Sequence, residues 1–359
     1  MARSGGTVNT LALQPIAPKP EQTTQTIMSL PTLPTDIEPV VRLALQEDIG
    51  DGDLTALLLP EDGLASGQVI TRDAAIFCGR AWFDEVFRQL SEDIVIEWEV
   101  EDGANVQPNQ VLCRFRGPAR ALVTGERTAL NFLQTLSGTA SNAGRFAKRI
   151  AGTRATVRDT RKTLPGLRTA QKYAVACGGA ANHRMGLYDA ILIKENHIMA
   201  AGSITAAVQQ AQLVANQRSQ ETGQPVPIEV EVESIEEMDE AILAGAELVL
   251  VDNFSIPLLN KAAILNKNHL RYNRSKAKVE ASGGITWENA RSIADTGVDY
   301  IAVGTLTKDL KSVDLSMRFD SEKGNDAVQE KTADGTATRS EGTNLDSVAE
   351  LLRSKNVKR

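Results

Sequence analysis

The first third of the chain combines one amphipathic helix pattern with short β-rich pieces. Apolar residues at the spacing of one helix face predict a helix over residues 36–48, with Asp36 as its cap. These apolar residues are Ile37, Val40, Val41 and Leu45. Between residues 67 and 117, β-rich pieces surround a second amphipathic helix centred on residues 82–90. We therefore predict a mixed α/β domain over residues 36–140.

One segment of this domain has an alternative interpretation. The stretch EDGANVQPNQVL, residues 101–112, resembles the turn of swivelling carrier domains, which present a modified lysine at a hairpin tip. No lysine occurs between Lys19 and Lys148, so a carrier would have no acceptor. We therefore expect a structural sandwich fold.

Beyond about residue 150 the pattern changes to strands that alternate with helices. A helical segment over residues 125–150 is expected to connect the two domains. Six short apolar strands follow, each with a helical stretch after it: ATVRDT, DAILIK, IEVEVE, LVLVDN, VEASGG and YIAVGT. Such alternation indicates parallel strands with helices outside. Because polar residues stand where the strands end, we predict a TIM-like α/β barrel over residues 141–319 with its chemistry at the carboxyl face. An open doubly wound sheet is the alternative.

The overall charge narrows the possible partners. The 359 residues carry a formal net charge of −7, and such a field opposes nucleic acid and anionic membranes. Sites for anions must then be local concentrations of Arg and Lys. No apolar run approaches the roughly 18 residues of a membrane span, and Cys78, Cys113 and Cys177 are spaced for neither a zinc site nor a disulfide framework. We expect a cytoplasmic protein that binds neither nucleic acid nor membrane.

Polar segments flank the two predicted domains. Residues 1–35 are rich in Thr, Pro, Gln and Ser, and residues 320–359 are rich in Gly, Thr, Asp and Ser. We predict a disordered amino-terminal tail and a mostly disordered carboxyl-terminal extension. The first segment contains a single acid, Glu21, so a weak organelle transit signal is the alternative there.

Two basic clusters lie at the first two strands of the predicted barrel, one directly after the first strand and one on both sides of the second. The sequence DTRKTLPGLR, residues 159–168, places Arg161 and Lys162 at a strand end. An Arg fork binds a carboxylate or phosphate at two points, and Lys adds a movable point charge. The sequence ANHRMGLYDAILIKENH, residues 181–197, adds His183, Arg184 and Lys194. Together they favour a site for a multiply charged anion; a solvated basic turn and a packed structural histidine are the alternatives.

Acidic residues and glycines occupy the later strand ends. In IEVEVE, residues 228–233, every second residue is a glutamate, which makes one strand face acidic, and Asp252 ends the next strand. Carboxylates from adjacent strand ends could hold Mg²⁺, and salt bridges to Arg161 or Lys194 without a metal are the alternative. The glycine turns ASGGI and VGTLT follow the last two strands, where barrels often bind phosphate.

Together these segments resemble the quinolinate phosphoribosyltransferase family over about residues 38–314. The matching blocks, in family order, are EDIGDGDLT, GERTALNFLQTLSGTA, RDTRKTLPGLR, KYAVACGGAANHRMGLYDAILIKENHI, EVEVES, LVDN, EASGGI and VGTLT. The resemblance implies an open-faced α/β sandwich domain, an α/β barrel, and a homodimer whose active sites form between the barrel of one subunit and the sandwich of the other. It also implies transfer of phosphoribosyl from phosphoribosyl diphosphate to quinolinate with decarboxylation, which yields nicotinate mononucleotide for NAD biosynthesis.

The resemblance also implies a role for each candidate residue. Arg127 would enter the partner's active site, and a basic pocket would bind the two substrate carboxylates through Arg161, Lys162, His183 and Arg184, with Thr160 beside it. Lys162, Lys194, Glu231 and Asp252 would be catalytic, and the two acids would bind the ribose hydroxyls and Mg²⁺. The 5′-phosphate site would comprise Ser282, Gly283, Gly284 and Gly304. One departure is Lys308, which stands where the family usually has His after Thr307.

Three other functions remain as alternatives. A relative of the family associated with molybdenum transport would act on another substrate, although the full basic set favours quinolinate. A barrel lyase or aldolase would use Lys194 as a Schiff-base nucleophile. A metabolite-binding regulator would bind phosphoribosyl diphosphate without turnover.

Overall fold

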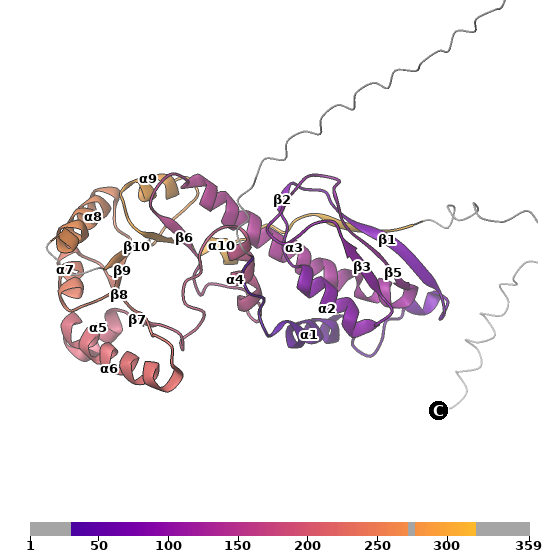
Figure 1. The fold of residues 1–359 in the computed structure, drawn as a ribbon, viewed down its shortest axis with the longest axis horizontal. Helices are drawn as coiled ribbons and strands as arrows, with labels where there is room; N and C mark the ends of the chain where they lie inside the picture. Colours follow the sequence, from indigo (N-terminus) through magenta and orange to yellow (C-terminus); the bar gives the residue numbers. More distant parts are fainter. Residues whose placement is uncertain (1–29, 272–276, 321–359) are drawn as a thin grey trace, which may run out of the picture. The chain divides into compact units, whose positions relative to one another are not determined.

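The computed structural model describes residues 30–271 and 277–320, which contain an antiparallel and a parallel sheet joined by a long helix (Figure 1). Of the predicted tails, 1–35 and 320–359, residues 1–29 and 321–359 lie outside the described residues, whereas residues 30–35 and 320 are described. Within the described part, no helix is long and apolar enough to cross a membrane.

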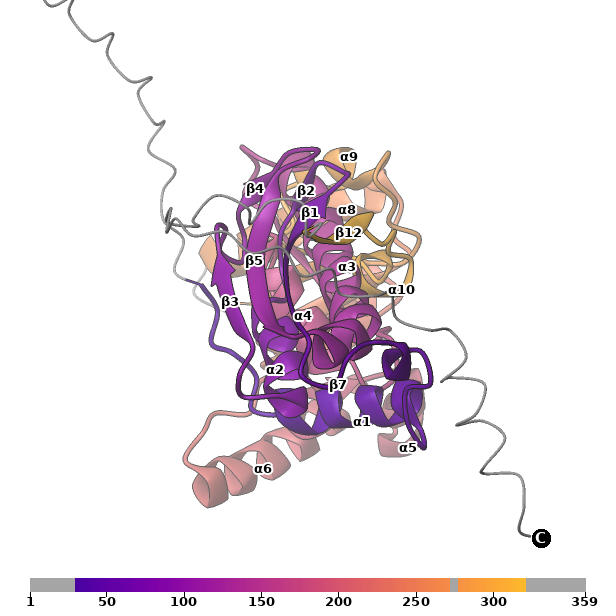
Figure 2. The same cartoon turned by 90° about the vertical axis from the view of Figure 1, so that its right-hand side faces the viewer.

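The antiparallel sheet has the strand order β12-β1-β5-β3 and confirms the mixed α/β unit predicted for the first domain. Its strands are β1 (Leu64–Thr71), β3 (Val95–Trp98), β5 (Val111–Pro118) and β12 (Leu315–Phe319). Strands β2 (Ala75–Ile76) and β4 (Asn105–Val106) form a separate pair. Figures 1 and 2 show β1, β5 and β3 side by side. The sequence assigned residues up to 319 to the barrel, but β12 returns to pair with β1.

Helices cover this sheet through an aromatic core. They are α1 (Ile37–Ile49), the 3-10 turn η1 (Ala56–Leu58) and α2 (Arg80–Leu90). Phe83 of α2 is fully buried and packs edge-on against Phe87 and Trp98. The helix predicted over residues 36–48 is confirmed as α1, but Asp36 makes no capping hydrogen bond. Its Oδ2 instead accepts a bond from the Thr169 hydroxyl at 2.7 Å, because tertiary packing provides a closer donor.

The long helix α3 (Ala119–Arg149) joins the two sheets and begins before the residue that the sequence predicted. It packs against α1, α2 and α4 (Arg168–Cys177). Small residues permit close approaches along α3: a Cβ added at Gly125 would lie 2.7 Å from Phe87 of α2, and one at Gly138 would lie 2.4 Å from the Lys311 carbonyl, which precedes β12. The boundary that the sequence placed at residue 140 falls inside this helix.

The parallel sheet contains all six strands that the alternating pattern predicted, in the order β6-β11-β10-β9-β8-β7. They are β6 (Thr156–Arg158), β7 (Ile191–Ile193), β8 (Ile228–Val232), β9 (Leu248–Asp252), β10 (Lys278–Ser282) and β11 (Tyr300–Ala302). The first strand lies beside the last, as the cyclic order of a barrel requires. The described residues form no ladder between β6 and β7, so closure of the expected TIM-like barrel is not shown.

Helices follow these strands on the outer side of the parallel sheet (Figure 1). They are α5 (Glu195–Ala201), α6 (Ile204–Thr222), α7 (Ile235–Leu243), α8 (Ile256–Arg271), α9 (Ala290–Asp295) and α10 (Thr305–Lys308). On β8, Val230 and Val232 join the apolar core with Met238 of α7. Because side chains alternate along a strand, Glu229 and Glu231 lie on the opposite face, away from the helices.

Candidate active site

A buried ion pair fixes the two basic segments relative to each other. Asp159 directly follows β6 and is fully buried, as is Lys172 in the middle of α4; their charged groups are 2.5 Å apart. Asp159 also accepts bonds from the His183 amide at 2.8 Å and the Asn182 side chain at 2.7 Å. Lys172 donates to the His183 carbonyl at 2.9 Å. This pair ties the segment before Arg161 to the segment around His183.

Arg161 and Arg184 leave buried donors available. The Nε atom of each guanidinium is buried and has no hydrogen-bond partner within the described part of the chain. Burial lowers the pKa of Arg184, and the neighbouring Arg161 charge lowers it further. A buried donor without a partner is costly, and two like charges repel, so an anion between them would relieve both penalties. Arg161 follows β6 and Arg184 precedes β7, and the structure brings the two together, as the sequence predicted.

His183 is held by protein groups on both ring nitrogens. Its Nε2 lies 2.6 Å from Glu229 Oε2, and these side chains are only 8% and 5% exposed. Its Nδ1 accepts the Arg184 amide at 2.8 Å. The remaining oxygen of Glu229, Oε1, is buried without a partner in the residues described. The sequence noted Glu229 only as part of an acidic strand face.

Glu280 is a buried acid that the sequence analysis missed. It lies on β10, and its Oε2 is 2.5 Å from Arg158 Nη1; the Arg158 guanidinium also stacks over Tyr300. Burial and the nearby Glu229 charge raise the pKa of Glu280 to about 7. His183, Glu229 and Glu280 offer ligand atoms within 4.8 Å of one another and could hold a metal ion. However, His183 and Arg158 already engage the two carboxylates.

We expect the difference in stability between a Glu280→Gln variant and the wild type to shift in favour of the variant as the pH rises. Folded Glu280 keeps its proton to about pH 7, whereas the ordinary glutamate value is 4.5. Between these pH values the folded state holds a proton that the unfolded state lacks. The contribution of Glu280 to the free energy of unfolding therefore falls with rising pH, by roughly 3 kcal/mol in all. Glutamine does not titrate. Melting temperatures of both proteins at about pH 5 and about pH 8 test this; an unchanged difference would contradict it.

Lys194 and the candidate metal ligands lie at the ends of β7, β8 and β9. Lys194 Nζ forms an ion pair with Glu231 Oε2, which is the salt bridge that the sequence analysis kept as an alternative to a metal. Asp252 Oδ2 accepts a bond from the Asn253 side-chain amide at 2.7 Å. Val232 of β8 pairs with Val251 of β9. Glu231 comes just before this pair on one strand, and Asp252 comes just after it on the other. Among the described residues, one oxygen of each carboxylate has no protein hydrogen bond, which fits a cation that keeps several water ligands.

The glycine turns are built around specific neighbours. A Cβ at Gly304 would lie 3.0 Å from Lys162 Cδ and 3.5 Å from Thr160 Oγ1, so the ends of β6 and β11 meet there. Thr307 donates to the Lys162 carbonyl at 2.8 Å. Gly283 has a φ of +85°, and a Cβ there would lie 2.1 Å from Asn253 Oδ1. Only glycine fits at that position, beside Ser282 and Gly284.

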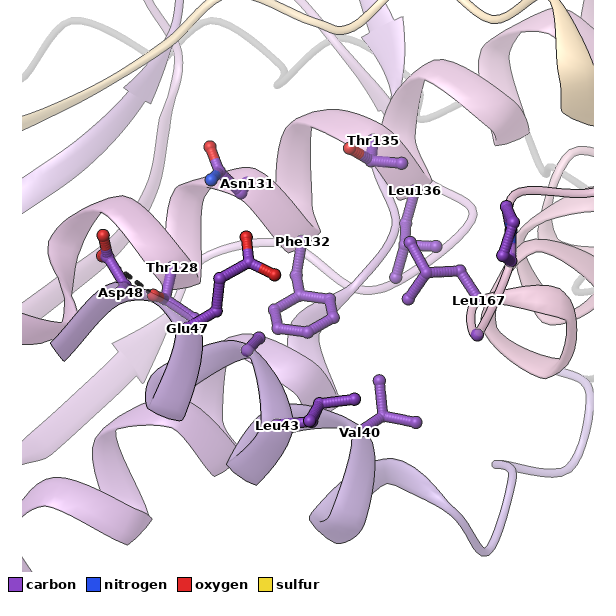
Figure 3. Close-up of a pocket in the computed structure, with 13 residues that line it drawn as sticks. Val40, Leu43, Glu47, Asp48, Thr128, Asn131, Phe132, Thr135, Leu136 and Leu167 are labelled. Carbon is purple, nitrogen blue, oxygen red and sulfur yellow. Dashed lines mark hydrogen bonds between the residues drawn. The ribbon is translucent and has the colours of Figure 1, made fainter. Parts of the chain in front are cut away.

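Arg127 is the candidate that stands on the long helix α3 and not near a strand end. It is exposed on α3 and makes no hydrogen bond or ion pair with any described residue. Its neighbour Thr128 lines a groove of about 340 Å³ (Figure 3). Residues of α1, α3 and the turn 165–167 form this groove, with Val40, Leu43 and Phe132 at its apolar floor.

Two of the three cysteines meet in space although the sequence separates them widely. Cys78, Cys177 and Asp102 place ligand atoms within 4.8 Å of one another, a grouping that could hold a metal ion and that the cysteine spacing did not reveal. Both oxygens of Asp102 already accept protein bonds, from the Gly79 amide at 3.0 Å and the Tyr173 hydroxyl at 2.8 Å. Burial raises the pKa of the Cys78 thiol well above its usual range.

Comparison with known proteins identifies the family of both domains. Residues 53–137 match the family model described as quinolinate phosphoribosyl transferase, N-terminal domain, and residues 139–318 match the C-terminal domain model. A probable carboxylating nicotinate-nucleotide pyrophosphorylase of Bacillus subtilis is 40% identical over 284 residues, 79% of this chain and 93% of the relative. The Mycobacterium leprae enzyme is 38% identical over 77% of this chain and 95% of its own length.

Solved structures give the same result. The nicotinate-nucleotide pyrophosphorylase of Francisella tularensis superposes with a TM-score of 0.74 at 41% identity, over 80% of this chain and 98% of that structure. NadC of Streptococcus pyogenes superposes with a TM-score of 0.72 at 33% identity, over 81% and 98%. From these matches to both domains and to nearly full-length relatives, the chain belongs to the quinolinate phosphoribosyltransferase family.

Proposed function

We propose that this chain transfers the phosphoribosyl group of 5-phosphoribosyl 1-diphosphate to quinolinate with decarboxylation. The products are nicotinate mononucleotide, diphosphate and CO₂. The observation that carries the proposal is the pair of arginines, Arg161 and Arg184, whose buried Nε donors lack partners among the described residues. A pyridine dicarboxylate supplies two anionic groups for two guanidinium forks. Membership of the family supports the same reaction.

The reaction follows from where charge develops. Departure of diphosphate leaves positive charge on the ribose carbon, which the carboxylates of Glu231 and Asp252 stabilise. The pyridine nitrogen then forms the bond to that carbon. The carboxylate next to nitrogen then leaves as CO₂. The electron pair of the broken C–C bond stays on the ring carbon beside the positively charged nitrogen, and that carbon takes up a proton from solvent. Arg161, Lys162 and Arg184 mainly orient the dicarboxylate, and Lys194 faces the diphosphate-bearing substrate.

Glu231 and Asp252 would hold Mg²⁺ during this reaction. They are hard oxygen ligands on neighbouring strand ends, and each has an oxygen free of protein hydrogen bonds within the described structure. When bound, Mg²⁺ would neutralise charge on the departing diphosphate. Ser282, Gly283, Gly284 and Gly304 would take the 5′-phosphate, with backbone amides as donors.

A direct assay tests this function. The protein is incubated with quinolinate, phosphoribosyl diphosphate and Mg²⁺, and nicotinate mononucleotide is followed by chromatography. We expect the nucleotide only when all three are present, and its formation should stop on chelation of Mg²⁺. Binding of phosphoribosyl diphosphate without any nucleotide would support the regulator instead. Borohydride trapping of a substrate on Lys194 would support the lyase.

We further propose a cytoplasmic homodimer, able to associate further, in which Arg127 completes the site of the partner subunit. Its exposed, unpaired position on α3 leaves it free to contact a second chain. Equal amounts of Arg127→Ala and Lys162→Ala chains are expected to regain about a quarter of wild-type activity, because random pairing restores one site in four. Activity is measured after unfolding and refolding the mixture. Failure of confirmed hybrid dimers to regain activity would contradict a shared site.

A further inference from the structure

His183 has no polar atom left for a substrate. Its backbone amide donates to Asp159 at 2.8 Å, and its carbonyl accepts from Lys172 at 2.9 Å. Its ring nitrogens are engaged by Glu229 and by the amide of Arg184. With 8% of its side chain exposed, the ring is almost wholly covered by its neighbours. A residue in this position can act on a substrate only through its neighbours.

The hydrogen bonds determine which ring nitrogen carries the proton. Nδ1 accepts the Arg184 N–H at 2.8 Å, so Nδ1 cannot itself carry a proton in this arrangement. The proton is therefore on Nε2, which donates to Glu229 Oε2 at 2.6 Å. A neutral imidazole with this tautomer satisfies both contacts, whereas an imidazolium would set two N–H groups against each other at Arg184.

Arg184 is the group that this arrangement holds in place. Its amide is bound by His183, and its Nη1 donates to the Ala190 carbonyl at 3.1 Å. Its Nε stays buried without a partner among the residues described. Glu229 therefore holds His183, and His183 holds the backbone of Arg184, whose Nε donor is unpaired in the described residues.

We propose that His183 is a positioning residue, held by Glu229 as the neutral Nε2–H tautomer, that orients Arg184 toward the dicarboxylate and does not itself contact the substrate. The proposal rests on the proposed function for the identity of the dicarboxylate. It differs from the role that the family resemblance implied, in which His183 is part of the basic pocket. Charge in that pocket then comes from arginine and lysine alone.

Two substitutions test the contacts of the two ring nitrogens separately. In the His183→Asn variant the side-chain amide oxygen would stand near the place of Nδ1 and could still accept the Arg184 amide, so this variant retains the contact that orients Arg184. In the His183→Gln variant the longer side chain places its amide nitrogen nearer to Glu229 but leaves the Arg184 amide without its acceptor. We expect kcat/KM for quinolinate to fall about 10- to 100-fold further in H183Q than in H183N. The KM for quinolinate should carry the difference, while the KM for phosphoribosyl diphosphate should be equal in the two variants.

A spectroscopic measurement makes the test independent of turnover. The chain has only three histidines, so ¹⁵N-histidine spectra of the full-length protein can be assigned with the H197Q and H269Q variants. At neutral pH we expect a proton on Nε2 of His183 and none on Nδ1, both before and after addition of quinolinate. Protonation of both nitrogens, or a direct contact to the bound ligand, would overturn the proposal, as would an H183Q variant more active than H183N. A wild-type protein inactive toward quinolinate would instead refute the proposed function and leave the tautomer result standing.

Discussion

Arg161→Ala and Arg184→Ala are each expected to lower kcat/KM for quinolinate roughly 30- to 5,000-fold. This corresponds to a transition state that is higher in free energy by about 2 to 5 kcal/mol. Each substitution leaves a substrate carboxylate in the pocket without its guanidinium partner, and unpaired buried charge is more costly than a lost surface contact. The two buried Nε donors are the structural basis of this expectation. Steady-state kinetics with quinolinate as the varied substrate measure the effect.

Two further variants separate charge from geometry. Arg161→Lys keeps the positive charge but loses the planar fork, so we expect it to recover only part of the activity. Arg218→Ala is the matched control, because Arg218 pairs with Glu221 on the exposed face of α6, away from the strand ends. Near wild-type kinetics in both Arg161→Ala and Arg184→Ala would show that neither binds the dicarboxylate.

Lys172→Met is expected to destabilise the folded protein by about 3 to 5 kcal/mol, because removal of one partner leaves Asp159 as an uncompensated buried charge. Burial raises the pKa of Asp159 and lowers that of Lys172, while their mutual attraction opposes both shifts. The lost contact to the His183 carbonyl should also lower activity. Thermal unfolding should show a melting temperature lower by roughly 10 °C.

A double variant tests whether the charge pairing is the cause. In Lys172→Met/Asp159→Asn neither buried charge remains, and the asparagine can still accept the His183 amide, so much of the stability should return. Lys148→Met on the exposed face of α3 is the control and should stay within about 0.5 kcal/mol of wild type. Equal stability of wild type and Lys172→Met would contradict the proposed role of the pair.

The strand ends could be read from the sequence because their signals are local. Alternating strands and helices located all six parallel strands, and the basic clusters after β6 and before β7 identified Arg161, His183 and Arg184 as neighbours in the fold. The acidic face of β8 was also correctly predicted, because side chains alternate along any strand. Its glutamates pair with His183 and Lys194.

The residues that support the site could not be found in the same way. Lys172 stands in a short helix in which consecutive residues are buried. The helix therefore has no separate apolar and polar faces from which the burial of Lys172 could be predicted. Glu280 follows a valine in an unremarkable strand, and its burial depends on Arg158, more than one hundred residues earlier. The return of β12 to β1 is likewise a long-range pairing. A charged residue on the strand face that points away from the helices is the one signal that could have singled out Glu280.

The central claim is that the converging arginines bind a dicarboxylate whose ring nitrogen attacks phosphoribosyl diphosphate. Quinolinate labelled with ¹³C in the carboxylate next to nitrogen tests this directly, with CO₂ and nicotinate mononucleotide quantified in one reaction. The account predicts one labelled CO₂ for each nucleotide formed, and none without phosphoribosyl diphosphate. Absence of nucleotide, or a nucleotide that retains the label, would contradict it.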